Sequence, residues 1–304
     1  MRLIFAGTPE AAVPSLDALA PSDHEVVRVV TRPPAPLGRK RVLTTSPVEA
    51  RATALGLPVL RASRLGPAET AELTDLGADL AVIVAYGGLV REPLLSAPRL
   101  GWVNLHFSLL PRWRGAAPVQ RALIAGDTTA GVAVFRLEAG LDTGPVLASE
   151  PVEIGALETA GHLLGRLAGI GARVLAGAVD RLADGSAVAV PQEGEPTLAP
   201  KLELADGRLD WTEPADRVFA RIRGCTPEPG AWTTTGDRRL KVLEAAPARE
   251  TPRLDPGVVA AAGRQVLVGC GEGALELLRV QPEGRGAMPA DAWLRGAGTG
   301  AVLA

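Results

Sequence analysis

Short apolar runs recur through the first two-thirds of the chain, and segments with helical length and spacing separate them. The runs that predict strands cover residues 2–7, 25–30, 57–60, 79–85, 101–106 and 131–137. The segments that predict helices cover residues 8–19, 46–56, 67–77, 116–126 and 157–185. Strands that alternate with helices are typical of a Rossmann-like α/β domain, with a mostly parallel sheet and helices on both faces.

Two of these helices carry signals for where they start. Thr8 is the predicted N-cap of the first helix, with Pro9 and Glu10 in its first turn. Ser46 and Glu49 stand at the spacing of a capping box at the start of the second helix.

The pattern changes after residue 185. Residues 186–204 hold three prolines with little periodicity, which is typical of an interdomain linker. Beyond them a predicted helix at 213–224 stands among short runs that predict strands, which cover residues 208–211, 230–235, 238–245, 263–270 and 274–280. We therefore expect a first domain of residues 1–185, a linker of residues 186–204 and a small OB-like β-barrel domain of residues 205–304.

The composition fits a soluble globular protein of two domains, with 304 residues, 47% of them hydrophobic and 22% charged. The longest apolar runs are too short to span a bilayer, and residues 1–20 lack the features of a secretory signal. We expect a cytoplasmic protein with no membrane partner. Cys225 and Cys270 lack the spacing of a zinc site or a disulfide scaffold, so we expect both to be reduced and structural.

The turn after the first predicted strand does not favour a dinucleotide. It reads "AGTPEAA", which holds Gly7 but not the two further glycines that let a pyrophosphate approach the backbone. The sequence therefore predicts no nicotinamide or flavin cofactor, and it contains no Walker loop.

The charge distribution indicates a local anion site. The net charge is −2, which argues against indiscriminate coating of nucleic acid. No acidic residue lies between Glu25 and Glu49, a window that contains Arg28, Arg32, Arg39, Lys40 and Arg41. A second acid-free window runs from Glu92 to Asp127 and contains four arginines.

Candidate chemistry lies where the strand "WVNLH" ends. Asn104 is the only asparagine of the chain, and His106 shares its strand face because strand side chains alternate with period two. In a parallel sheet, ligands bind at the carboxyl ends of the strands. Downstream, Asp142 stands between Gly140 and Gly144 in a predicted loop that joins two strands. An amide donor, an imidazole and a carboxylate suit an acyl transfer without a covalent enzyme intermediate.

Other chemistries fit these residues less well. Ser108 could be a nucleophile, but "HFSLLP" does not resemble a nucleophile elbow. One histidine and one distant aspartate are too few ligands for a metal site, so none is expected. His24 and His162 are expected to lie on the surface and in a helix, without a catalytic role.

At these residues the chain resembles the folate-dependent formyltransferases. The resemblance is carried by "NLHFSLLPRWRGAAPVQRALIAGD", by "TAGVAVFRLEAGLDTGPVL", and by co-linear motifs that include "IFAGTPE", "VIVAYGGLV" and "IRGCTPEPGAW". It covers nearly the whole chain, and the version "SLLPRWRGAAP" is similar to the members that act on charged initiator tRNA.

The resemblance implies roles for individual residues. The catalytic trio matches Asn104, His106 and Asp142. The folate-binding positions match Ser108, Leu109, Leu110 and Pro111, together with Tyr86, Gly87, Gly88 and Leu89. A tRNA-reading loop matches residues 31–45, with Arg39 at its main arginine and with Lys40 and Arg41 beside it.

The implied reaction transfers the formyl group of 10-formyltetrahydrofolate to the amino group of methionyl-initiator-tRNA. The chain departs from the family pattern at Ala11, where Phe is usual, and in the prolines of its basic loop. Two alternatives stay open: a formyltransferase that acts on another amine, such as a sugar nucleotide or a purine precursor, and a non-catalytic RNA-binding relative. The C-terminal domain is expected to bind tRNA. Arg217, Arg221 and Arg223 are candidates, but residues 205–304 hold 13 basic and 13 acidic side chains, so a solvated face is an equal alternative. The protein is expected to be a monomer.

Overall fold

The fold is described from a computed structural model of the chain, which describes residues 1–38, 41–248, 254–298 and 300–304. Its contacts divide the chain into two compact units. The first unit comprises Met1–Ala116, Ala130–Val152 and Leu164–Leu198. The second comprises Ala117–Thr129, Glu153–Leu163 and Ala199–Ala304. The chain passes between the two units several times, and the boundaries expected at residues 185 and 205 stay a prediction.

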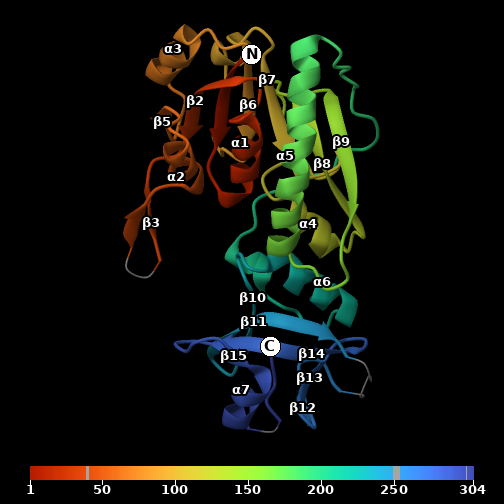
Figure 1. Cartoon of the computed structure of the whole chain (residues 1–304). Coiled ribbons are helices and arrows are strands. Elements are labelled where there is room, and N and C mark those ends of the chain that lie inside the picture. The colour runs from red at the N-terminus through yellow and green to blue at the C-terminus, as the bar shows by residue number, and fades with distance from the viewer. Residues whose placement is uncertain (39–40, 249–253, 299) are drawn as a thin grey trace. The chain divides into compact units, whose positions relative to one another are not determined.

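A seven-stranded sheet forms the centre of the first unit (Figure 1). Its strands, in spatial order, are β5 (Val59–Arg61), β2 (Glu25–Thr31), β1 (Arg2–Gly7), β6 (Leu80–Val84), β7 (Trp102–His106), β8 (Thr129–Arg136) and β9 (Val146–Glu153). The first five strands pair in parallel, and β8 runs antiparallel to β7. The expected mostly parallel Rossmann-like sheet is confirmed, and the central strands are fully buried because both of their faces are covered.

Helices follow the strands as the sequence predicts. They are α1 (Val13–Leu19), α2 (Pro47–Ala54), α3 (Pro67–Asp75), α4 (Pro118–Ala125) and α5 (Ala160–Asp184), with short 3₁₀ helices at Glu10–Ala12 and Leu94–Ser96. Ser46 caps α2 as expected, since its hydroxyl accepts the Glu49 N–H at 3.0 Å. The predicted cap at Thr8 is wrong: its hydroxyl instead donates to the Tyr86 carbonyl at 3.1 Å, and a 3₁₀ turn opens the helical segment.

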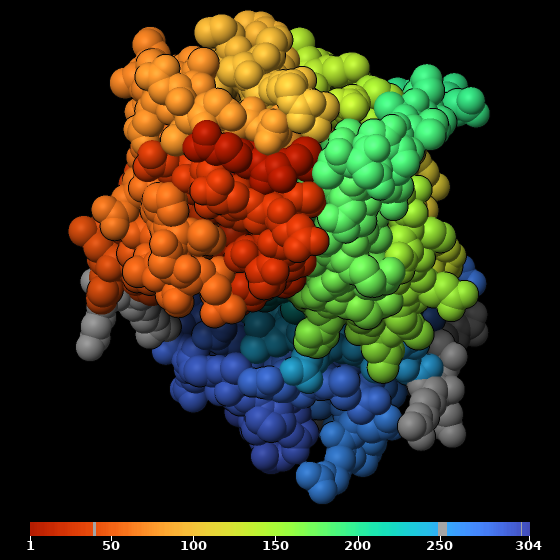
Figure 2. Space-filling model, turned by 45° about the horizontal axis from the view of Figure 1, so that its top comes forward, coloured from red at the N-terminus to blue at the C-terminus, as the bar shows by residue number. Residues whose placement is uncertain are grey.

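The long helix α5 covers the sheet face opposite Asn104 and His106. A Cβ on Gly171 would lie 2.8 Å from Leu105, so only glycine lets α5 approach β7 so closely. Leu105 points away from its neighbours Asn104 and His106 because β7 is a strand. Near the C-terminal end of α5, Asp180 accepts a hydrogen bond from His24 Nε2 at 3.0 Å, and Figure 2 shows α5 in green beside the red start of the chain. One face of β7 is thereby closed by packing, and the other is left for the site.

The second unit contains the helix α4, the first residues of α5, an antiparallel sheet and further helical segments. Its strands run in the order β10 (Ala231–Thr235), β11 (Arg238–Pro247), β14 (Ala274–Pro282), β13 (Gln265–Gly269) and β12 (Val259–Ala262), with β15 (Met288–Pro289) against β14. The further helical segments are a 3₁₀ turn (Leu204–Gly207), α6 (Ala215–Cys225) and α7 (Ala290–Ala297). The antiparallel β domain is confirmed, and its OB-like classification stays a prediction.

Two elements of this unit depart from expectation. Leu209 and Trp211 are buried with strand-like alternation, but the predicted strand at 208–211 is wrong because Asp210 turns the chain by accepting Thr212 N–H at 2.9 Å. The helix α7 was not predicted.

Cys225 and Cys270 are free and buried, and burial raises the pKa of both thiols to about 11. In the described ranges, no helix is both long and apolar enough to cross a membrane.

Candidate active site

Asn104 and His106 project from the same face of β7. In the register with β8, Asn104 is opposite Phe135 and His106 is opposite Ala133. Side chains of opposed residues lie on one face, so these four residues form a patch on the side not covered by α5. The Asn104 side chain is half-buried and makes no hydrogen bond within the described part of the chain. Its amide is therefore available as a donor.

The imidazole of His106 is held at both nitrogens. Nε2 donates to the Trp113 carbonyl at 2.8 Å, because a carbonyl oxygen can only accept. Nδ1 lies 3.8 Å from Oδ2 of Asp142. Burial lowers the pKa of His106, and this effect outweighs the neighbouring Asp142 carboxylate and the Trp113 hydrogen bond, which both raise it. The resting ring is therefore neutral, with Nδ1 bare and facing a carboxylate.

Asp142 reaches His106 from the loop between β8 and β9, at residues 137–145. Its backbone is left-handed, with φ of 50°, and Oδ2 accepts the Gly115 N–H at 2.8 Å. A Cβ on Gly144 would lie 1.8 Å from the Arg136 carbonyl, so this loop can fold back only with glycine there. The structure therefore brings His106 and Asp142 together and places Asn104 on the same face.

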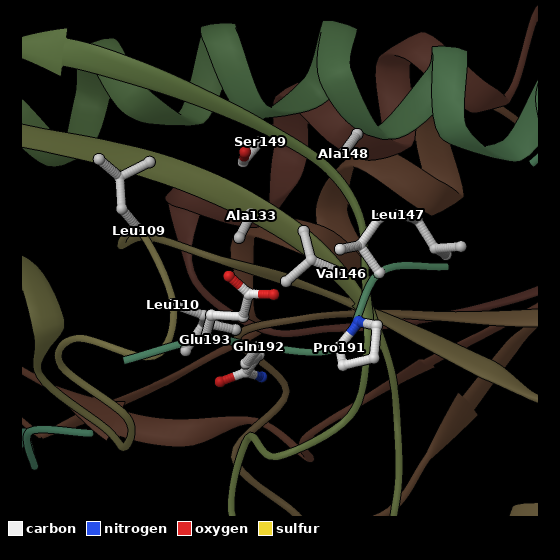
Figure 3. A pocket seen from close by; sticks show the side chains of 11 residues that line it. Leu109, Leu110, Ala133, Val146, Leu147, Ala148, Ser149, Pro191, Gln192 and Glu193 are labelled. Carbon is white, nitrogen blue, oxygen red and sulfur yellow. The ribbon is translucent and has the colours of Figure 1, made fainter. Parts of the chain in front are cut away.

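A pocket of about 350 Å³ adjoins this patch (Figure 3). Leu109, Leu110 and Ala133 line it together with residues 146–149 and 190–193. Ala133 connects it to the trio, since it is the β8 partner of His106. The lining is largely apolar, and Glu193 is its one charged side chain; Figure 3 shows this carboxylate turned toward Ala133 and Val146. Such a concave, mostly apolar site with few polar groups is typical of small-molecule binding.

The other residues expected near folate lie outside this pocket lining. Ser108 is buried, and its hydroxyl donates to the Arg112 carbonyl at 2.6 Å. Pro111 accepts a backbone hydrogen bond from Thr197 at 3.3 Å. Both residues shape the loop that carries Leu109 and Leu110.

Residues Tyr86–Leu89 form a tight turn after β6. The Tyr86 side chain is buried in a hydrophobic cluster, and its hydroxyl donates to the Ala62 carbonyl at 2.6 Å. Gly87 has φ of +77°, and a Cβ on Gly88 would lie 2.5 Å from the Tyr86 ring. Arg32 donates to the Gly87 carbonyl, and Leu89 is exposed. The buried Tyr86 side chain anchors this segment to the core and points away from solvent. The backbone of the segment and the Leu89 side chain are therefore the parts left to contact a ligand.

The basic loop is partly described. It forms a hairpin of β3 (Ala35–Leu37) and β4 (Val42–Thr44), both exposed. Arg39 and Lys40 lie outside the described residues, and Arg41 is exposed with φ of 50°.

In the second unit, the arginines first considered for RNA are engaged within the fold. Arg221 pairs with Glu213 at 3.5 Å, and Arg223 donates to the Gly155 carbonyl at 3.3 Å. A different basic group lies on the exposed side of β10, where Arg208 and Arg239 stand 5.9 and 4.3 Å from the Trp232 ring. Lys241, the β11 partner of Trp232, shares that side. No sequence pattern marks this group, because its members are scattered over more than 30 residues.

Sequence reasoning also missed residues that hold the trio. Trp113 and Gly115 act through backbone groups, and no side-chain pattern marks them. Gln192, from the segment predicted as a linker, contacts the Asp142 loop through its amide. In the described ranges, no group of three or more histidine, cysteine, aspartate or glutamate side chains could hold a metal ion.

Comparison with known proteins gives this geometry its context. A formyl transferase family model matches residues 1–179, and a model of the formyl transferase C-terminal domain matches residues 201–298. The chain belongs to the formyl transferase family. Within that family its full-length relatives are methionyl-tRNA formyltransferases: it is 59% identical to the protein of that name from Clavibacter sepedonicus over 304 residues, covering 100% of both chains. It is 51% identical to that of Streptomyces coelicolor over 300 residues, covering 98% of this chain and 97% of the relative.

Solved structures share the fold at lower identity. The sugar 3N-formyl transferase WlaRD, solved with dTDP and 5-N-formyl-THF, aligns with a TM-score of 0.70 at 14% identity, over 94% of this chain and 98% of that one. HypX from Aquifex aeolicus in complex with tetrahydrofolic acid aligns with a TM-score of 0.64 at 17% identity, over 98% of this chain and 47% of that one. At these identities the likeness concerns the fold alone.

Proposed function

We propose that the protein transfers the formyl group of 10-formyltetrahydrofolate to the α-amino group of methionyl-initiator-tRNA. The observation that carries the proposal is the meeting of His106 and Asp142 beside Asn104, in a chain 59% identical over its full length to a methionyl-tRNA formyltransferase. A binding module would have no use for a neutral imidazole buried against a carboxylate next to an available amide.

The reaction follows from the side chains of this site. The amine nitrogen attacks the formyl carbon, a C–N bond forms, and negative charge develops on the formyl oxygen. The Asn104 N–H donates to that oxygen, which lowers the energy of the transition state. The bond from the formyl carbon to N10 of the folate then breaks, and N10 takes a proton. The products are formylmethionyl-tRNA and tetrahydrofolate.

His106 and Asp142 together handle the proton that the amine loses. Nδ1 of His106 is bare and lies 3.8 Å from the Asp142 carboxylate, so a proton taken up at Nδ1 would face a negative charge. Once protonated, the imidazolium is stabilised by the adjacent carboxylate and adds positive charge beside the oxyanion. The same proton is available for the departing N10. No metal or redox group is needed in this sequence of steps.

Folate is assigned to the pocket beside the trio. Leu109 and Leu110 supply apolar walls, and the turn at residues 86–89 supplies backbone groups at the end of the neighbouring strand β6. Ser108 and Pro111 fix the shape of the loop that carries Leu109 and Leu110. The folate-binding positions implied by the family resemblance at residues 108–111 thus either line this pocket or shape its walls.

The tRNA is assigned to two basic regions. The hairpin at residues 31–45 contributes Arg39, Lys40 and Arg41, and the second unit contributes the group around Trp232. Guanidinium groups beside a half-buried indole suit RNA, since they meet phosphates while the ring meets a base. The protein acts as a cytoplasmic monomer in this proposal.

Incubation with 10-formyltetrahydrofolate and charged initiator tRNA tests the proposal directly. Formylmethionyl-tRNA should form with charged initiator tRNA, no product should form with uncharged tRNA, which lacks the amine, and far less formylated product should form with a dTDP-amino sugar. Formylation of the sugar instead would replace the proposal with the sugar-nucleotide alternative.

A further inference from the structure

The Asp142 loop is held by a side chain from outside the motifs that carry the family resemblance. Gln192 donates through Nε2 to the Asp142 carbonyl at 2.8 Å and to the Gly144 carbonyl at 2.8 Å. Its Oε1 accepts from Arg114 Nη2 at 2.6 Å and from Arg114 Nε at 3.2 Å. All four hydrogen-bonding positions of this amide are therefore used.

The direction of these bonds is fixed by chemistry. A guanidinium group only donates, so the Gln192 atom beside Arg114 must be the oxygen. Backbone carbonyls only accept, so the atom beside Asp142 and Gly144 must be the nitrogen. A carboxylate in the same place would keep the Arg114 contact, but it would set an oxygen against two carbonyl oxygens.

The partners of Gln192 are the parts of the chain that hold the trio. Arg114 lies between Trp113, whose carbonyl accepts from His106, and Gly115, whose N–H donates to Asp142. The segment that contains Gln192 also holds Trp113, because Thr197 Oγ1 accepts the Trp113 N–H at 2.9 Å. Residues 192–197 therefore fix both sides of the contact between His106 and Asp142.

The loop needs such support because its backbone is strained. Asp142 has φ of 50°, a left-handed conformation that aspartate adopts only at a cost, and it persists where neighbours determine it. Gln192 and Gly115 are the neighbours that bond to Asp142, one at its carbonyl and one at its carboxylate.

We propose that Gln192 is a positioning residue for formyl transfer, which holds the Asp142 carboxylate at His106 through the Asp142 and Gly144 carbonyls. The inference rests on the proposed function, since it assumes that Asp142 takes part in proton transfer. It assigns a role in the reaction to the segment of residues 190–198, which pattern alone predicts to be a linker.

The test is a double-mutant cycle between Gln192→Glu and Asp142→Asn, measured as kcat for formylation of charged initiator tRNA. Gln192→Glu alone should lower kcat on the order of 10- to 100-fold, because a small displacement of a catalytic group has effects of this size. In the Asp142→Asn background the same change should lower kcat by no more than about two-fold, since a residue that acts through Asp142 has nothing left to position.

Two further variants keep the test decisive. Gln192→Met removes both donated bonds without adding charge, and it replaces Gln192→Glu if thermal melting shows that the glutamate variant is unfolded. Gln281→Glu is the matched control, because Gln281 also donates to a backbone carbonyl, that of Arg285 at 3.0 Å, but in the second unit. Because Gln281 is the β14 partner of Lys241, the kcat of this variant is measured at saturating tRNA, where it should equal the wild-type value.

The outcomes separate this inference from the proposed function. Active wild type with unchanged kcat in a folded Gln192 variant overturns the positioning role and leaves the function intact. Losses that multiply in the double variant overturn it as well, because they show that Gln192 acts independently of Asp142. Wild type that forms no formylmethionyl-tRNA overturns the proposed function itself.

Discussion

The His106 imidazole lies between two acceptors, the Trp113 carbonyl at 2.8 Å from Nε2 and the Asp142 carboxylate at 3.8 Å from Nδ1. Only one nitrogen carries a proton in the neutral ring, and the carbonyl requires it at Nε2. In the resting protein no proton therefore lies between Nδ1 and the Asp142 carboxylate. Nδ1 can accept the proton that the attacking amine loses.

Asp142→Asn should lower kcat and shift the pH profile. Asp142 raises the pKa of His106 against the larger lowering by burial, so its loss should lower that pKa further. The limb of the kcat–pH profile that reports His106 should then move to lower pH. The amide can still accept the Gly115 N–H, which keeps the loop folded. A variant with the wild-type profile would show that Asp142 does not act on His106.

Stability should fall as pH falls through the ordinary histidine range because of the same burial. The folded pKa of His106 lies below the unfolded value of about 6.5, so the unfolded chain binds the proton first. Stability from this group is present above the unfolded pKa and is lost as pH falls from there toward the folded pKa. His106→Gln should therefore show a flatter dependence of Tm on pH between about 7 and 5. Equal slopes in the two proteins would contradict the direction of the shift.

The basic hairpin should serve tRNA and not folate. Arg39→Ala is expected to raise KM for charged tRNA about ten-fold or more, since hydrogen bonds between charged groups contribute about 1.5–3 kcal/mol. Its KM should also depend less on salt, because fewer counterions are released. Arg39→Lys should recover only part of the loss. Arg64→Ala, an exposed arginine outside the two acid-free windows, is the control and should behave as wild type. Identical KM values in all four proteins would remove the hairpin from tRNA binding.

The group around Trp232 should contribute separately. Trp232→Ala is expected to raise KM for tRNA several-fold while kcat stays unchanged, because stacking on a base contributes about 1–3 kcal/mol. Trp232→Phe should retain most of the affinity. Arg279→Ala is the matched control on the same sheet, since Arg279 is paired with Glu244 at 3.0 Å. If Trp232→Ala and Arg279→Ala bind tRNA equally well, the indole has no part in recognition.

The sequence predicts those parts of the fold that depend on local pattern. Strands β1, β2, β6 and β7 were predictable because buried parallel strands are continuous apolar runs. The shared face of Asn104 and His106 follows from the period of a strand. The contact between His106 and Asp142 also depends on the left-handed backbone at Asp142. Neither the strand pattern nor the loop composition predicts that conformation.

What the sequence could not predict depends on tertiary contacts of backbone groups. Gln192 meets Asp142 across 50 residues and Arg114 across 78, within a proline-rich segment that has no periodicity. Thr8 has the residue type of a helix cap, but the nearby Tyr86 carbonyl takes its hydroxyl. Residues 208–211 alternate like a strand because Leu209 and Trp211 both reach the core, although Asp210 turns the backbone. For Gln192 and Thr8 a partner distant in sequence decides the outcome, whereas the turn at Asp210 is local and is hidden by the alternation of Leu209 and Trp211.

The role proposed for Asn104, stabilising the oxyanion of formyl transfer, is measured by the turnover of Asn104 variants. Asn104→Ala should lower kcat on the order of 100- to 1,000-fold while KM for folate and for charged tRNA stays near the wild-type value, as expected for the loss of one oxyanion donor. Asn104→Asp keeps the shape of the side chain but has no N–H, and it should be at least as slow. Near-normal turnover in either folded variant would rule out an oxyanion role for Asn104.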